Sequence, residues 1–189
     1  MRLGTNLRQA RRFVLAGAVL GMVLFGSGQS AQATVNTVTF SGASQVAAAT
    51  TDWTVGFTTN ATGNTNLVAG STVTAVFDSA FTIPATPTIA LLTGFVSCTA
   101  TGSTTGTTVT ITLAGASCAL GKGVAATFSI AGITNPVAGT YLAAGFTVAT
   151  SKETTAVADG ADEVITAGVP GAPTSVAGTA GNAQVSLTW

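Results

Sequence analysis

Two cysteines, Cys98 and Cys118, are the only cysteines in this chain of 189 residues, and each follows a run of strand-forming residues. The N-terminal segment described below predicts export, and exported proteins meet an oxidising environment that favours disulfides. Two cysteines allow one pairing only. We therefore expect a disulfide that closes a loop of about 20 residues and stabilises the fold by roughly 3 kcal/mol. Two free, buried thiols are the alternative, and a zinc site is disfavoured because the chain has no histidine.

Carboxylates are the other side chains that could do chemistry, and the chain has six acids: Asp52, Asp78, Glu153, Asp159, Asp162 and Glu163. General acid–base catalysis commonly recruits histidine, so a carboxylate pair, as in glycoside hydrolysis, is the remaining route. Asp52 precedes the core-facing Trp53 and should point to solvent, while Asp78 stands at a strand end, where acids commonly begin turns. We therefore predict no catalytic residue and no enzyme. A clustered pair of buried carboxylates in a cleft would be needed to argue otherwise.

The run Asp159-Gly160-Ala161-Asp162-Glu163 could supply oxygen ligands to calcium, as loops of extracellular modules do. It lacks the spacing of an EF-hand loop, and a solvated acidic turn is the simpler explanation of the run. The sequence therefore predicts neither a metal site nor a cofactor.

Residues 1–33 have the pattern of a signal peptide and are set aside from the fold. Four arginines precede an apolar run from Phe13 to Phe25, and a small-x-small motif, Ala31-Gln32-Ala33, follows it. We predict cleavage before Thr34 and a secreted or cell-surface location. The apolar run of about 13 residues is shorter than the roughly 20 residues needed to span a bilayer, and an uncleaved anchor is the alternative.

The charge that is left after this cleavage restricts the partners. The remaining chain has two lysines, Lys122 and Lys152, and no arginine against its six acids, which gives a formal charge of −4. Nucleic acids and anionic membrane surfaces are both bound through clusters of basic residues. We therefore expect no nucleic-acid partner and no membrane association once the signal peptide is removed.

The composition and the spacing of apolar residues predict an all-β fold. The chain is 47% hydrophobic and only 6% charged, and the threonine and valine that are abundant in it favour pleated, half-buried strands. Residues 50–59 alternate most clearly, with Trp53, Val55 and Phe57 on one face and polar residues on the other. About eight such strands, with turn signals roughly every 8 to 12 residues, predict two antiparallel sheets packed face to face.

Some local elements can be predicted as well. Residues 99–106 (TATGSTTG) are expected to form a turn between strands, and residues 139–150 one long strand. The repeated Thr-x-Thr stretches do not recur at a fixed period, which argues against a solenoid array. We interpret them as the solvent-facing sides of ordinary strands.

The last part of the chain, from Pro170 to Trp189, resembles the opening of a fibronectin type III domain. The matching positions are a Pro-x-x-Pro motif, an apolar residue in a first strand, a Gly-Asn turn and an alternating second strand: Pro170, Pro173, Val176, Gly181, Asn182, Val185, Leu187 and Trp189. The resemblance implies that residues 169–189 are a linker and the truncated start of such a domain, with further domains downstream in a longer parent chain. The alternative is that residues 183–189 add a strand to the first domain.

Residues 34–168 more loosely resemble the immunoglobulin-like modules that bacterial surface and secreted proteins carry beside fibronectin type III repeats. The resemblance is carried by the GITNPVAGTY turn at residues 132–141 and the FTVATS strand at residues 146–151. It implies an antiparallel immunoglobulin-like β-sandwich that acts as a non-catalytic spacer or adhesive module. Its partners would be a cell-wall or extracellular glycan or protein.

A carbohydrate-binding accessory module of a secreted polysaccharide-degrading enzyme is the alternative function. In that case Trp53 could stack on a sugar ring at the surface. Its alternation with Val55 and Phe57 favours a place in the core instead.

Overall fold

The computed structural model describes residues 33–171 and 177–188, which form strands, turns and one 3-10 turn, η1 (Ala143–Gly145). Nearly all of the predicted signal peptide lies outside the described residues. No helix in the described part of the chain is both long enough and apolar enough to cross a membrane.

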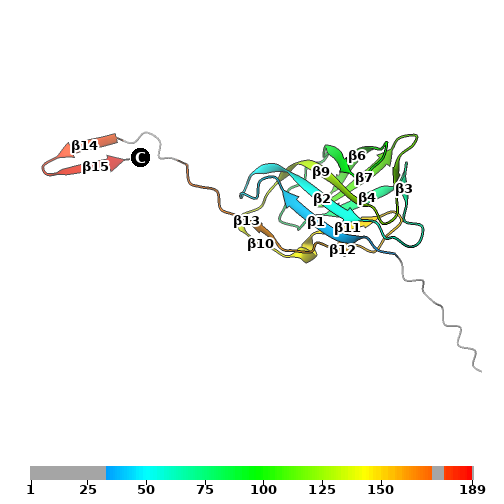
Figure 1. Cartoon of the computed structure of the whole chain (residues 1–189). Coiled ribbons are helices and arrows are strands. Elements are labelled where there is room, and N and C mark those ends of the chain that lie inside the picture. The colour runs from blue at the N-terminus through cyan, green and yellow to red at the C-terminus, as the bar shows by residue number, and fades with distance from the viewer. Residues whose placement is uncertain (1–32, 172–176, 189) are drawn as a thin grey trace, which may run out of the picture. The chain divides into compact units, whose positions relative to one another are not determined.

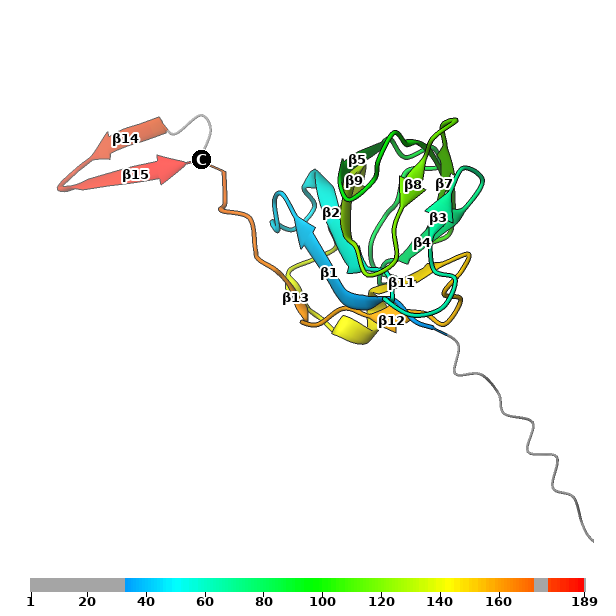
Figure 2. The same cartoon turned by 45° about the vertical axis from the view of Figure 1, so that its right-hand side comes forward.

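Two antiparallel sheets form the β-sandwich that the alternation predicts (Figures 1 and 2). The four-stranded sheet has the order β1-β2-β9-β5, with the strands β1 (Asn36–Gly42), β2 (Thr50–Thr58), β9 (Ala125–Thr134) and β5 (Ile89–Thr93). The five-stranded sheet has the order β12-β11-β4-β7-β6, with the strands β12 (Val157–Ala158), β11 (Thr147–Thr150), β4 (Thr72–Val76), β7 (Thr108–Ala114) and β6 (Thr99–Thr105).

Shorter strand pairs complete the structure. In the sandwich, β3 (Leu67–Val68) pairs with β8 (Ala119–Leu120), and β10 (Gly139–Tyr141) pairs with β13 (Glu163–Ile165). Strands β14 (Ala177–Gly181) and β15 (Gln184–Thr188) pair with each other. The division into domains stays a prediction, and so does the alternative in which residues 183–189 add a strand to the first domain. Val176 and Trp189 lie outside the described residues, and the fibronectin type III identity stays a prediction.

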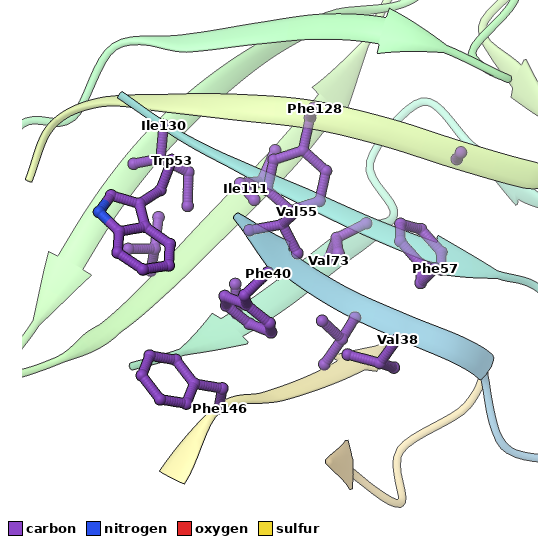
Figure 3. Packing of buried hydrophobic residues seen from close by; sticks show 14 of the residues in the cluster. Val38, Phe40, Trp53, Val55, Phe57, Val73, Ile111, Phe128, Ile130 and Phe146 are labelled. Atoms are coloured by element: carbon purple, nitrogen blue, oxygen red, sulfur yellow. The ribbon is translucent and has the colours of Figure 1, made fainter. Parts of the chain in front are cut away.

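Alternation along the strands directs one set of side chains into the space between the sheets (Figure 3). On β2, Trp53, Val55 and Phe57 are at most 2% exposed, as their spacing predicts. Strands β4 and β7 of the other sheet contribute buried residues to the same core: Val73, Ala75, Val109, Ile111 and Leu113. Burial of this apolar surface is the main source of the sandwich's stability.

Two local predictions are wrong. Residues 99–105, predicted as a turn, form strand β6, and only Gly106 and Thr107 connect it to β7. Gly106 has a φ of 61°, which suits a two-residue hairpin connection, so the strand preference of threonine prevails over the glycines. Residues 139–150, predicted as one strand, divide into β10, η1 and β11, because β10 pairs with β13 whereas β11 pairs with β4 and β12.

Trp53 lies at the centre of a cluster of aromatic rings. Its ring centroid is 5.3 Å from that of Phe81 and 5.9 Å from that of Phe77, both in edge-on geometry, and it stacks on Phe146 at 6.3 Å. Edge-on and stacked pairs of this kind stabilise a core beyond the area they bury. Because Trp53 is fully buried, its indole N–H must find a partner inside the protein.

Asn135 is that partner. The Nε1 of Trp53 donates a hydrogen bond to Oδ1 of Asn135 at 3.0 Å. The Nδ2 of Asn135 in turn donates to the carbonyl oxygens of Ser44 (2.8 Å) and Val46 (3.0 Å). The buried asparagine therefore attaches the loop after β1 to the centre of the core.

Replacing Trp53 by phenylalanine should leave Oδ1 of Asn135 without a donor and loosen the loop at residues 44–46. We expect Trp53→Phe to lower the free energy of unfolding by about 2–4 kcal/mol, from the unpaired buried acceptor and the cavity together. Amide hydrogen exchange should become faster at Ala47, beside the loop. Phe57→Leu, a core substitution that does not touch Asn135, is the control, and equal exchange at Ala47 in both variants would contradict the link.

Candidate functional site

Two acids of the predicted acidic turn, Asp159 and Glu163, lie together beside β1. They are 9% and 6% exposed, so the solvated turn predicted for this run is wrong for these two residues. The side chains of Glu163 and Asp159 share a hydrogen bond, and Oε2 of Glu163 accepts another from Nε2 of Gln45 at 2.5 Å. The oxygens of Asp159 accept from the amides of Phe40 (3.3 Å) and Gly160 (2.6 Å). We call Gln45, Asp159 and Glu163 the carboxyl cluster.

Strand β13 positions Glu163 through its pairing with β10. Glu163 lies opposite Tyr141 in this ladder, and the alternation along β13 buries Glu163 and Ile165 while Val164 faces solvent. Asp162, one position earlier, accepts a hydrogen bond from the amide of Ala143 at 2.8 Å. The alternation along the chain therefore separates two neighbouring acids. Glu163 points inward, while Asp162 holds the 3-10 turn η1 through its hydrogen bond to Ala143.

Burial changes the acidity of two side chains. The pKa of Glu163 is raised from 4.5 to about 7, first because burial disfavours the charged form and then because of the charge and hydrogen bond of Asp159. The hydrogen bond from Gln45 acts in the opposite direction. Burial also raises the pKa of Glu153, against hydrogen bonds from the Asn60 amide (2.7 Å) and the Thr150 hydroxyl.

The carboxyl cluster does not have the geometry of a glycosidase pair. In those enzymes the carboxyl groups are about 5–5.5 Å or about 6.5–9.5 Å apart, which leaves room for the sugar or for water. Asp159 and Glu163 are hydrogen-bonded to each other, and protein donors occupy oxygens that calcium would need. Among residues 33–171 and 177–188, no three acidic, cysteine or histidine side chains gather so as to hold a metal ion. The arrangement fits a structural role.

The predicted disulfide is confirmed. Cys98 and Cys118 are bonded to each other, with a Cα–Cα distance of 4.3 Å. The bond joins the segment before β6 to the segment before β8, where Val96 also forms an isolated antiparallel bridge with Ala119. Cys118 is buried in the core, so the bond holds two loops closed over one end of the sandwich.

Other candidate residues do not gather with the carboxyl cluster. Asp52 is exposed on β2, as predicted, and Oδ1 of Asp78 accepts from the amide of Ala80 in a turn. Trp53 is buried, which excludes it as a platform for stacking sugars. In the described part of the chain the aromatic side chains are buried or, for Phe95 and Tyr141, half-buried.

Hydroxyl side chains line much of the outer face of strands β4, β7 and β6. Register brings Thr74, Thr110 and Ser103 into one row across β4, β7 and β6, and the next row contains Thr72, Thr112 and Thr101. Charged side chains are absent from these rows. The strand pairing thus confirms that the Thr-x-Thr stretches are solvent-facing sides of ordinary strands, and such a face offers no attraction to a charged partner.

Sequence analysis did not identify Gln45 or Asn135. Gln45 lies in the segment SGASQVAAAT, which has no periodic pattern, and its role depends on Glu163, far away in the sequence. Asn135 precedes a proline and is typical of a turn residue, yet it is only 3% exposed. The available signal was a polar residue directly after a strand with the buried aromatic Phe128, because a buried indole needs an acceptor nearby.

The carboxyl cluster should make stability depend on pH. Because the pKa of Glu163 in the folded state lies above 4.5, the protonated form stabilises the fold, and this contribution is lost as pH rises from about 4.5 to about 7. Urea unfolding of Glu163→Gln between pH 4 and 8 should have a flatter pH dependence than the wild type. Glu153 titrates in both proteins, so an unchanged slope would exclude Glu163 as the source.

Loss of the disulfide should destabilise the sandwich without changing its architecture. For a loop of this length, Cys98→Ala with Cys118→Ala should lower the free energy of unfolding by about 3 kcal/mol. Urea unfolding under non-reducing conditions measures the difference, and the circular dichroism of the strands should be retained. The wild type in reducing agent is the control; if all three samples unfold at the same urea concentration, the bond is not a stabilising element.

Comparisons with known proteins assign the chain to no family. No protein-family model matches the sequence, and no curated protein matches it. Among solved structures, the chain is similar to the crystal structure of BslA, a bacterial hydrophobin, with a TM-score of 0.39 and 23% identity. The match covers 71% of this chain and 98% of that chain. At this TM-score nothing about the present chain is inferred from the similarity, and the immunoglobulin-like and fibronectin type III resemblances both stay predictions.

Proposed function

We propose that this chain contains a non-catalytic spacer module of a secreted or cell-surface bacterial protein. The observation that carries the proposal is that the chain enters the sandwich at one end and leaves it at the other (Figures 1 and 2). At the first end, Asn36 pairs with Thr58. At the opposite end, Thr166 forms a bridge with Val46, in the loop that follows β1.

Entry and exit at opposite ends support a spacer, because the sandwich then keeps the segment before it at a set distance from the segment after it. Strand β1 alone, from Asn36 to Gly42, advances by about 20 Å at roughly 3.3 Å per residue. The tightly packed core between the two ends resists compression and bending. A module that only needed to present a binding loop would have no need for this arrangement.

Two further features support an extracellular spacer. The disulfide between Cys98 and Cys118 fits an oxidising compartment, in agreement with the predicted signal peptide. The hairpin of β14 and β15 resembles the beginning of a second module of a type that occurs in series. A spacer role needs neither a cofactor nor a catalytic residue, and its partners are the neighbouring modules of the parent protein.

The alternative role in carbohydrate binding depended on Trp53, which is not available for sugar stacking. Trp53 is 0% exposed, and the aromatic side chains in the described residues offer no exposed platform for sugar stacking. The outer hydroxyl rows could form hydrogen bonds with a glycan. Such bonds replace bonds to water, however, and each contributes only about 1 kcal/mol.

Spin labels can test whether the sandwich holds its two ends apart. Asn36→Cys with Ala167→Cys, labelled without reducing agent, should give a narrow distance distribution centred above about 20 Å, because the core fixes both ends. The control is Asn36→Cys with Lys122→Cys, both placed at the end where the chain enters, which should give a shorter distance. A broad distribution for the first pair would contradict the spacer.

A sedimentation assay with insoluble glycans separates the two functions in the same preparation. The exported full chain should stay in the supernatant with cellulose, chitin and peptidoglycan. Retention in the pellet that soluble oligosaccharides reverse would replace the spacer proposal by the carbohydrate-binding alternative.

A further inference from the structure

The first and last segments of the sandwich lie side by side, and strands β1 and β12 are neighbours in both views (Figures 1 and 2). We call residues 38–47 and 159–166 together the terminal clamp. Six hydrogen bonds cross between the two segments: Gly160 N to Val38 O (3.3 Å), Phe40 N to Asp159 Oδ2 (3.3 Å), Gln45 Nε2 to Glu163 Oε2 (2.5 Å), Thr166 N to Gln45 O (2.7 Å), Thr166 Oγ1 to Gln45 O (3.1 Å) and Ala47 N to Thr166 O (2.8 Å).

The two segments of the terminal clamp run in the same direction. The bridge between Val46 and Thr166 is parallel. Over the whole length the partners also advance together, although the first two bonds cross. Residue 159 bonds to 40 and residue 160 to 38, whereas residue 163 bonds to 45 and residue 166 to 45 and 47. Both segments therefore run from the end where the chain enters the sandwich toward the end where it leaves.

This direction decides how the terminal clamp responds to tension. A pull on the chain before β1 draws residues 38–47 toward the first end, while a pull on the chain after β13 draws residues 159–166 toward the opposite end. The two segments are then pulled past each other along their length. Bonds that lie across the pull share the load and must break together, whereas bonds in a hairpin pulled open from its end break one at a time.

We propose that the terminal clamp is the element of the sandwich that carries tension, and that it resists this tension in shear when the module is held between its neighbours. The proposal rests on the spacer function, because only a module attached at both ends carries tension. It adds a mechanical role to the carboxyl cluster, whose hydrogen bonds form the middle of the clamp.

Two features keep the terminal clamp from opening at one end. Asn135 attaches the loop at Ser44 and Val46 to the buried Trp53, so this part of the first segment cannot peel away without disturbing the core. Asp159 and Glu163 are nearly excluded from solvent, which limits the access of water that would compete for their hydrogen bonds. The disulfide lies outside both segments.

Single-molecule force spectroscopy on the exported full chain, held by its first and last residues, tests the terminal clamp. Forced unfolding is governed by the unfolding rate, so the rate at a fixed force is the quantity to measure. Gln45→Met removes the bond to Glu163 and keeps the length of the side chain. It should raise the unfolding rate about five- to tenfold, the effect expected when a hydrogen bond that is intact until the rupture is lost.

Thr127→Val is the matched control, because it removes one side-chain hydrogen bond, from Thr127 to Thr93 (2.8 Å), on the outer face of the four-stranded sheet. It should change the rate by less than about twofold, because this bond lies outside the load path. Thr166→Val, which removes the hydroxyl bond to Gln45, is a second clamp variant with little risk to folding and should act in the same direction as Gln45→Met.

Two outcomes would overturn the proposal. One is an equal effect of the clamp variants and the control on the rate under force; the other is unfolding of the wild type in a series of small steps at low force. A third outcome combines the two experiments. If the clamp variants change the unfolding rate as expected but the spin labels give a broad distance distribution, the spacer function is contradicted and the terminal clamp is not. The two proposals can therefore fail separately.

Discussion

A single buried polar contact, between the indole N–H of Trp53 and the side-chain oxygen of Asn135, is the constraint on which the rest of the sandwich depends. A tryptophan at the centre of a core needs an acceptor there, and this structure supplies it by burying a second polar side chain, that of Asn135. The amide of Asn135 then needs acceptors of its own, and it finds them in the main chain at Ser44 and Val46. The position of this loop is thus a consequence of satisfying one hydrogen-bond donor.

The position of the loop in turn determines the carboxyl cluster. Gln45 lies between the two anchored residues and donates to Glu163, which shares a hydrogen bond with Asp159. After cleavage before Thr34 the chain would contain two lysines and no arginine, so buried acids have few cations to pair with. Neutral donors satisfy them instead, and the raised pKa of Glu163 is the physical result of burial without a counter-charge.

The two ends of the sandwich are held by different chemistry. At one end a covalent bond between Cys98 and Cys118 closes two loops, which restricts the unfolded chain more than it shapes the core. At the other end a loop, a 3-10 turn and the β10–β13 pair are held by hydrogen bonds and by the packing of Tyr141 on Phe81. Each of these hydrogen bonds is weak. In the proposed terminal clamp they resist tension only if they break together, and this requires that residues 38–47 and 159–166 run in the same direction.

The sequence by itself determined the all-β class, the two-sheet architecture, the disulfide and the burial of Trp53, because alternation with a period of two residues and the count of two cysteines are local properties. It misassigned residues 99–105, where glycine content concealed a strand that exists because β7 pairs with it. Only the tertiary structure brought Gln45 to Glu163 and made the first and last segments parallel neighbours. Those contacts join residues more than 100 positions apart, and no local propensity records which strands meet when two sheets close around a core.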